Sequence, residues 1–217
     1  VATGDPRRVP NEFADAHVHF FGPYAYRSSF WAADEQQESE RALAHLESLP
    51  ATLLAAPEVR AILDRSGIAV LSFGSIEQHG AHLPCGTDTM AADLVAADLA
   101  ERLGALVVPG GPYGVTPIHA GHPGTISLRR RVFEEYVANI CEELAAMGAS
   151  VLVLVNWHEG NIASLDAVAT DLQDRQGIVV VAAQACYTAQ RIYAERGGGL
   201  THGGAIETLA VMAVDHD

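Results

Sequence analysis

The sequence predicts an α/β fold in which a mostly parallel β-sheet is flanked by helices on both faces. Short β-branched, apolar segments alternate with longer segments whose apolar residues recur every three or four positions. The short segments are apolar at successive positions, which favours strands buried on both faces, as in a parallel sheet. The first 50 residues do not follow this alternation. We therefore expect an N-terminal arm at residues 1–50 and a single domain at residues 51–217.

The predicted strands are bounded by small or polar residues. IAVLSFGS at 68–75 is apolar and β-branched, and ASVLVLVN at 149–156 is the most apolar of the set. ALVVPGG at 105–111 and IVVVAAQ at 178–184 have the same character. The predicted helices are amphipathic, and glycines close several of them. They lie at 57–67, 89–104, 128–148, 161–177 and 188–198.

Composition excludes several classes of function. Apolar residues make up 49% and charged residues 18%, which is typical of a globular protein. The net charge of −14 opposes binding to nucleic acid and to anionic membranes, so we expect neither partner. The three cysteines form no CxxC pair, and no signal-peptide pattern or membrane-length apolar run is present, so we expect a cytoplasmic protein.

The arm at residues 1–50 is rich in aromatic residues, and we expect a helix near residues 34–48. It either wraps a neighbouring subunit or packs on its own domain, and the sequence favours neither alternative. Its DAHVHFFG stretch resembles the HxH pair of the TIM-barrel amidohydrolases. The chain is too short for that barrel, so we interpret His17 and His19 as structural.

Candidate metal ligands follow the first strand, in GSIEQHGAHLPCGTDT. Glu77 and His79 are two residues apart, so in an extended segment both side chains point to the same side. Asp88 follows after a glycine- and proline-containing loop that can fold back. Glutamate, histidine and aspartate together form a ligand set suited to Zn²⁺, Mn²⁺ or Fe²⁺.

Further polar segments follow the other strands. VNWHEGN places His158 at the carboxyl end of the third strand, where ligands bind in parallel sheets. In the same segment Asn161 is suited to capping the next helix. THGGAIET carries His202 and Glu207, and YGVTPIHAGHPGTISL carries two more histidines. This clustering of histidines and carboxylates at strand ends predicts a metal site.

Four of these segments resemble the creatininase family. GSIEQHGAHLPCGTDT is similar to its GSxEQHGPHLPLGTD signature, HAGHPGTISL to its HxGFPGT(I/L)SL segment, NWHEGN to NGHGGN or NGHYEN, and HGGAIET to HAGxxET. They occur in the family's order over residues 55–214. The resemblance implies a creatininase-like α/β fold, a commonly hexameric assembly, and hydrolysis of C–N bonds in cyclic or linear amides.

The resemblance also implies roles for single residues. Glu77, His79, Asp88 and His158 occupy ligand positions of the family, with Asp88 bridging two metals. Glu207 matches a residue that acts as ligand or base. The implied cofactor is a divalent metal, Zn or Mn with Fe as an alternative, one or two per subunit. His202 matches a histidine proposed to protonate the leaving group, and we assign Glu159 as a further candidate for proton transfer.

Three departures from the family pattern concern the substrate and the fifth ligand. Creatininase carries a carboxylate two residues after the histidine of HYEN, whereas Gly160 stands there in this chain and the acid is Glu159. We therefore expect Glu207 rather than Glu159 to be the fifth ligand. Trp157 replaces a usual glycine, and the substrate pocket is expected to include Trp157 and the two histidines of the HAGHPGT loop, His119 and His122. His122 stands where phenylalanine is common, and these changes argue against creatine or creatinine as substrate.

The sequence thus predicts a metal-dependent amidohydrolase that acts on a small-molecule substrate and forms a homo-oligomer. Two alternatives remain open. The same metal site can act on another bond, in a lactone, a cyclic ketone or a peptide tail. The chain can also be a degenerate, non-catalytic member of the family.

Overall fold

A computed structural model describes residues 51, 54–194 and 202–214. The predicted N-terminal arm and its helix near 34–48 lie outside the described residues. So do His17 and His19, which we interpret as structural. The chain divides into two compact units, Val1–Ala61 and Ile62–Asp217, and every residue of the candidate site belongs to the second.

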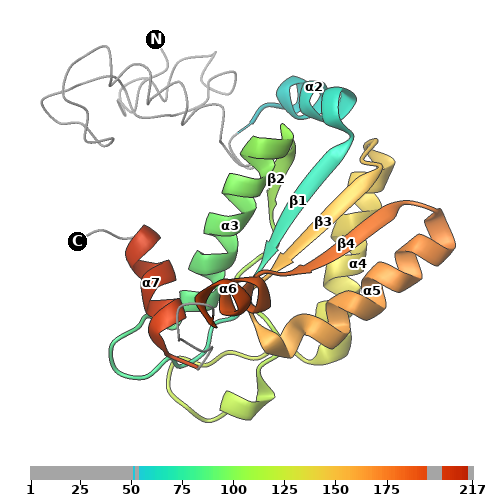
Figure 1. Cartoon of the computed structure of the whole chain (residues 1–217). Helices are drawn as coiled ribbons and strands as arrows, with labels where there is room; N and C mark the ends of the chain where they lie inside the picture. Colours follow the sequence, from blue (N-terminus) through green and yellow to red (C-terminus); the bar gives the residue numbers. More distant parts are fainter. Residues whose placement is uncertain (1–50, 52–53, 195–201, 215–217) are drawn as a thin grey trace, which may run out of the picture. The chain divides into compact units, whose positions relative to one another are not determined.

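The predicted parallel sheet is confirmed. It consists of β1 (Ile68–Phe73), β2 (Leu106–Pro109), β3 (Val151–Asn156) and β4 (Val179–Gln184), all parallel, in the order β2-β1-β3-β4 (Figure 1). The central strands β1 and β3 are almost wholly buried, as expected. The edge strands β2 and β4 are not, which corrects the expectation that every strand is covered on both faces. An edge strand has one neighbour fewer, and the helices here do not reach over both of its faces.

Two features of the helices differ from the sequence prediction. Helix α3 begins at Thr87, so Asp88 lies inside its first turn rather than before it. Helix α7 was not expected, because its sequence AIETLAVMAV is apolar nearly throughout and has no amphipathic period. The helices are α2 (Ala56–Ser66), α3 (Thr87–Leu103), α4 (Arg130–Ala146), α5 (Ile162–Gln176), α6 (Ala185–Ala194) and α7 (Ala205–Val214), with 3-10 turns at Pro117–His119 and Glu159–Asn161.

The two faces of the sheet bury different helices. Val70 and Val153 are register partners and pack with Ala96 of α3 on one face. Phe73 points to the other face, where its ring meets Phe133 of α4 edge-on at a centroid distance of 5.9 Å. Figure 1 shows α3 on one side of the sheet and α4 and α5 on the other. The sheet is therefore fixed between two layers, and its carboxyl edge is held rigidly.

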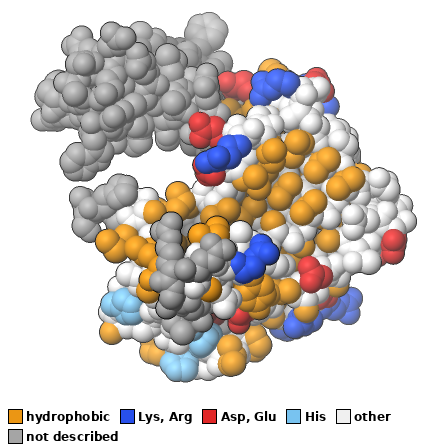
Figure 2. Space-filling model, in the orientation of Figure 1, with side chains coloured by type: hydrophobic (Ala, Val, Ile, Leu, Met, Phe, Trp, Pro, Cys, Tyr) orange, Lys and Arg blue, Asp and Glu red, His pale blue; other side chains and the backbone are white. Residues whose placement is uncertain are grey.

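One part of the sheet remains open on the α3 side. Val179 and Val181 of β4 are 50% and 45% exposed, and Figure 2 shows hydrophobic side chains gathered on this face of the molecule.

None of the helices in the described part of the chain combines the length and the apolar character needed to cross a membrane.

Close packing at the end of β1 brings α3 against the sheet. A Cβ atom added to Gly74 would lie 2.3 Å from the backbone nitrogen of Thr89, so only glycine fits there. Phe73 and Asn156 are register partners, so β1 and β3 end side by side. The first turn of α3 and the loops after β1 and β3 therefore meet at one edge of the sheet.

Candidate metal centre

The segment after β1 is extended and pairs with residues 125–126. Ile76 forms an isolated antiparallel bridge with Ile126, and the Gln78 amide donates to the hydroxyl oxygen of Thr125 over 3.0 Å. This extended conformation turns the side chains of Glu77 and His79 inward, where they are 2% and 1% exposed. The sequence-based reason for pairing these two residues thus matches the local geometry.

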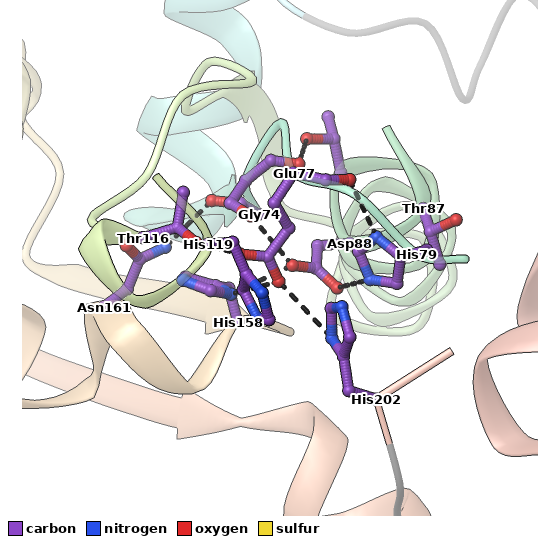
Figure 3. A network of polar contacts seen from close by, with 12 residues as sticks. Gly74, Glu77, His79, Thr87, Asp88, Thr116, His119, His158, Asn161 and His202 are labelled. Carbon is purple, nitrogen blue, oxygen red and sulfur yellow. Dashed lines mark hydrogen bonds and ion pairs between the residues drawn. The ribbon is translucent and has the colours of Figure 1, made fainter. Parts of the chain in front are cut away.

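Asp88 lies between two histidines (Figure 3). Its Oδ1 is 3.1 Å from Nε2 of His79, and its Oδ2 is 3.0 Å from Nδ1 of His158. The hydroxyl of Ser75 also donates to Oδ2 over 3.0 Å. Because each carboxylate oxygen faces a different imidazole, Asp88 is arranged as a carboxylate that can serve two cations.

Both histidines are anchored through the nitrogen that points away from Asp88. Nδ1 of His79 lies 3.0 Å from the carbonyl oxygen of Glu77, and Nε2 of His158 lies 3.1 Å from that of Val115. When these nitrogens donate to the carbonyls and the ring is neutral, its other nitrogen carries the lone pair that can bind a metal. Metal-binding histidines in proteins are characteristically held in this way.

Glu77 is fixed by two contacts. Its Oε1 lies 3.3 Å from Nδ1 of His158, and its Oε2 accepts a short hydrogen bond from the hydroxyl of Thr116. Sequence reasoning missed Thr116, and no spacing pattern identifies it, because it lies in a loop far along the chain from Glu77.

A buried amide network shapes the loop after β3. The side-chain nitrogen of Asn156 donates to the carbonyl of His158 over 2.7 Å, and its oxygen accepts from the His158 amide over 3.2 Å. The side chain of Asn161 donates to the Gly74 carbonyl and accepts from the Val115 amide, each over 2.9 Å. Asn161 precedes α5 but makes no capping bond there, which corrects its interpretation as a cap. It ties three loops together instead.

Glu207 reaches the cluster from α7. It is 6% exposed, its Oε2 accepts from the Gly203 amide over 2.6 Å, and it lies 3.8 Å from Nε2 of His79. Its neighbour His202 is exposed, with Nε2 2.6 Å from the Gln78 carbonyl oxygen and Nδ1 3.7 Å from Oε1 of Glu77.

The histidines of the HAGHPGT loop are placed differently from each other. The ring of His119 stacks on that of His202 with centroids 4.3 Å apart, and Gln78 contacts both rings through its side-chain nitrogen. His122 is exposed and contacts the His119 carbonyl over 3.1 Å. His119 therefore belongs to the site, whereas His122 lies next to His119 and does not line the cavity. Sequence reasoning did not identify Gln78, which lies between two predicted ligands.

Of the two glutamates considered as the fifth ligand, Glu207 lies in the buried cluster and Glu159 does not. Glu159 is exposed and hydrogen-bonded to Tyr187, and the structure does not bring it into the cluster of Glu207. A Cβ atom added to Gly160 would lie 2.0 Å from the Val115 oxygen and 2.5 Å from Nε2 of His158. Only glycine fits position 160 in this backbone, so no carboxylate reaches the cluster from there.

Charge pairing lowers the pKa of the central carboxylates. Burial alone would raise the pKa of Asp88, but hydrogen bonds from His158 and His79 hold it well below its usual range. Burial opposes protonation of His158, yet Asp88 and Glu77 together raise its pKa to about 10. Burial raises the pKa of Glu207, and the nearby Asp88 charge adds to this effect. The cluster is a buried group of negative charges compensated by imidazolium.

These contacts define three overlapping ligand groups among the described residues. In each group one ligand atom per residue lies within 4.8 Å of the others. We call Glu77, Asp88 and His158 the strand cluster, and His79, Asp88 and Glu207 the helix cluster. A further group of the same kind is formed by Glu77, His79 and His202.

The donor chemistry fits a divalent metal. Within the described residues, the ion pairs of Glu77, Asp88 and Glu207 are made with histidines, and none is made with an arginine. Burying three carboxylates is costly unless cations compensate their charge. Two buried imidazoles and three carboxylates form a nitrogen and oxygen donor set suited to zinc, manganese or iron.

The cluster opens into a cavity of about 640 Å³. Trp157 is 6% exposed and lines one wall, as the sequence suggested, and His122 is not among the lining residues. The same tryptophan also lines a separate apolar cavity of about 340 Å³ between α3, α6 and α7. Around the candidate ligands, the larger cavity is lined by Val115, Pro117, Ile118, His119, Arg130, Glu159, Gly160, Gln190 and His202.

Comparison with known proteins gives consistent results. The profile of the creatininase family, described as creatinine amidohydrolase, matches residues 52–217. The creatinine amidohydrolase of Pseudomonas putida is 32% identical over 169 residues, which cover 69% of this chain and 65% of that protein. A solved structure described as creatininase with Mn superposes with a TM-score of 0.66 at 30% identity, covering 77% of this chain and 73% of the other.

A second kind of relative matches a shorter stretch. The mycofactocin precursor peptide peptidase of Mycolicibacterium smegmatis is 37% identical over 106 residues, which cover 46% of this chain and 42% of that protein. The chain therefore spans less than two thirds of the length of these two curated relatives.

Proposed function

Because this chain belongs to the creatininase family, we propose that it is a metal-dependent amidohydrolase that cleaves a C–N bond of a small cyclic or linear amide. The observation that carries this proposal is Asp88, whose two oxygens face His79 and His158 at 3.1 and 3.0 Å in a buried site. The similarity to a creatinine amidohydrolase over 169 residues supports the reaction class.

We propose that the strand cluster and the helix cluster each hold one divalent ion, zinc or manganese, with Asp88 shared between them. When bound, the metal supplies a water activated near neutral pH and polarises the substrate carbonyl. His79 and His158, once they release the proton that faces Asp88, would hold it through their inner nitrogens, because their other nitrogens are anchored to backbone carbonyls.

The chain's own residues supply proton transfer and positioning. We assign the Glu207 carboxylate, whose pKa burial raises, as the group that accepts a proton from the attacking water. We assign His202, exposed at the cavity and held by the Gln78 carbonyl, as the donor to the departing nitrogen. Glu159 lines the outer part of the cavity and is better placed to contact substrate than to bind metal.

The test is removal and return of metal. Treatment with a chelator should abolish hydrolysis of a panel of cyclic and linear amides, and zinc or manganese should restore it. Elemental analysis of the active protein should find a divalent ion. Full activity in protein shown to be free of metal would refute the proposal. Metal-loaded, folded protein that turns over no amide, lactone or diketone would favour the non-catalytic alternative.

A second candidate is cleavage of a peptide bond. The 37% identity to a mycofactocin precursor peptide peptidase over 106 residues supports it. The two candidates share the metal site and differ only in what the cavity accepts. Competition between short peptides and cyclic amides in one assay would rank them by kcat/KM.

We also propose that the protein is a homo-oligomer. Support comes from the exposed valines of β4 and from α7, where Leu209 and Met212 are 52% and 59% exposed. Apolar surface of this kind is typical of subunit interfaces. Light scattering would determine the mass in solution, and Val181→Glu should lower it. A monomeric wild-type protein would contradict the proposal.

A further inference from the structure

We propose that Arg130 forms an anion-binding subsite in the cavity of the candidate metal centre, and that the substrate is an amide that also carries a free carboxylate. This inference rests on the proposed function, because it assigns a substrate class to the same cavity.

The position of Arg130 is the first step. It is the first residue of α4, and it lines the same cavity as Glu77, Asp88 and His158. Among the lining residues it is the single arginine, and the whole chain contains no lysine. A guanidinium stays charged at every relevant pH, whereas the histidines of the cavity titrate. The cavity thus has one permanent positive side chain.

The second step is that this charge is oriented but not neutralised. Arg131, the next residue, is bound to Glu135 with Nε 2.8 Å from Oε1. Arg130 forms no ion pair with a carboxylate in the described part of the chain, and its Nη1 donates to the hydroxyl oxygen of Ser164 over 3.2 Å. Ser164 is fully buried and in turn donates to Oε1 of Glu134 over 3.0 Å. The serine therefore stands between the guanidinium and that carboxylate.

The third step is what such a group recognises. A guanidinium matches a carboxylate through paired, charge-assisted hydrogen bonds. Ser164 lies in the first turn of α5, just beyond the loop that carries His158. A substrate with its carboxylate at Arg130 and its amide at the ligand cluster is held at two points, which favours one orientation for attack. The net charge of −14 otherwise repels such a substrate.

The experiment measures binding by calorimetry on the metal-loaded full chain. The probes are N-acetylglycine, an amide with a free carboxylate, and N-acetylglycinamide, which lacks that charge. Wild-type protein should bind N-acetylglycine about 10-fold to 100-fold more tightly. Arg130→Gln should remove this preference, and Arg130→Lys should keep part of it. Arg131→Gln is the matched control and should leave the preference unchanged.

The outcomes separate this inference from the proposed function. Equal preference in wild type and Arg130→Gln would overturn the subsite, even if the protein hydrolyses amides. A preference that vanishes on chelation of the metal and does not respond to Arg130→Gln would also overturn it, because the carboxylate would then sit on the metal. An Arg130-dependent preference in a protein without hydrolase activity would support the subsite and refute the proposed reaction.

Discussion

The two clusters that share Asp88 are held by different parts of the molecule. The strand cluster takes Glu77 and His158 from loops that directly continue β1 and β3. The outward-facing polar atoms of these two ligands are bound in turn, Glu77 by the Thr116 hydroxyl and His158 by the Val115 carbonyl. Both supports are buried residues of the loop between β2 and α4.

The helix cluster depends instead on α7. Within the described residues, the Glu207 carboxylate accepts one hydrogen bond, from the Gly203 amide, and its contact with His79 is longer, at 3.8 Å. The outer residues of α7, Leu209 and Met212, are more than half exposed. Asp88 therefore links the strand cluster, which buried core residues hold in place, to the helix cluster, which needs Glu207 from the partly exposed helix α7. We expect the two metals to differ in affinity accordingly.

The largest effect is expected for Asp88→Asn, which removes the residue common to both clusters. We expect metal content near zero by elemental analysis and a loss of kcat/KM on the order of 10³-fold. Asp98→Asn, on the exposed side of the same helix, is the control and should retain both. Full metal content in Asp88→Asn would show that Asp88 is not a ligand shared by the two clusters.

The next effect distinguishes the clusters from each other. Glu207→Gln should release the metal of the helix cluster and leave that of the strand cluster in place. Glu77→Gln should release the metal of the strand cluster and leave that of the helix cluster in place. It should release both metals if the helix cluster binds its metal only after the strand cluster is filled. Metal content per subunit and stepwise competition with a chelator measure this. If Glu207→Gln loses all metal, the order of affinity that we infer from the supports is wrong.

A smaller effect is expected for Thr116→Val, which removes the hydroxyl that fixes Glu77. Loss of such a support typically weakens metal binding about 10-fold to 100-fold. The strand cluster should be affected and the helix cluster should not, as read from chelator competition. Thr188→Val, which removes an exposed hydroxyl on α6, serves as the control.

The smallest effect concerns local opening near α7. Cys141 lies in α4 and Cys186 in α6, and burial raises their thiol pKa values to about 12 and about 11. Since the thiolate is the reactive form, both should react slowly with a thiol reagent at pH 8. Chelation should speed the reaction of Cys186 about tenfold through local opening and leave Cys141 unchanged. Equal acceleration at both cysteines would point to global unfolding instead.

The central strands β1 and β3 could be predicted from sequence, because each is a short run of apolar residues and such runs are typical of buried strands. The exposed face of β4 could not, because Val179 and Val181 are as apolar as residues of a covered strand. Helix α7 was missed for a related reason, since an apolar stretch of ten residues has no polar face to give a period.

The convergence of Glu77, His79, Asp88 and His158 could be predicted because strand ends meet at one edge of a parallel sheet. The residues that orient them could not, because Thr116 and Asn161 reach the site through contacts 39 and 46 positions apart in sequence. A single sequence shows that such residues are polar, but not what they touch. The sequence favoured Glu207 over Glu159 as the fifth ligand, and in the structure Glu207 is buried whereas Glu159 is exposed.

Trp157 gives the protein an optical sensor of its own metal content. The indole precedes His158, is 6% exposed, and its Nε1 has no hydrogen-bond partner among the described residues. The chain contains two tryptophans, so Trp31→Phe leaves one emitter beside the cluster. Its fluorescence should be quenched by paramagnetic Mn²⁺ and change little with Zn²⁺. Occupancy of the strand cluster, and its loss in the variants above, can then be followed in real time without a substrate.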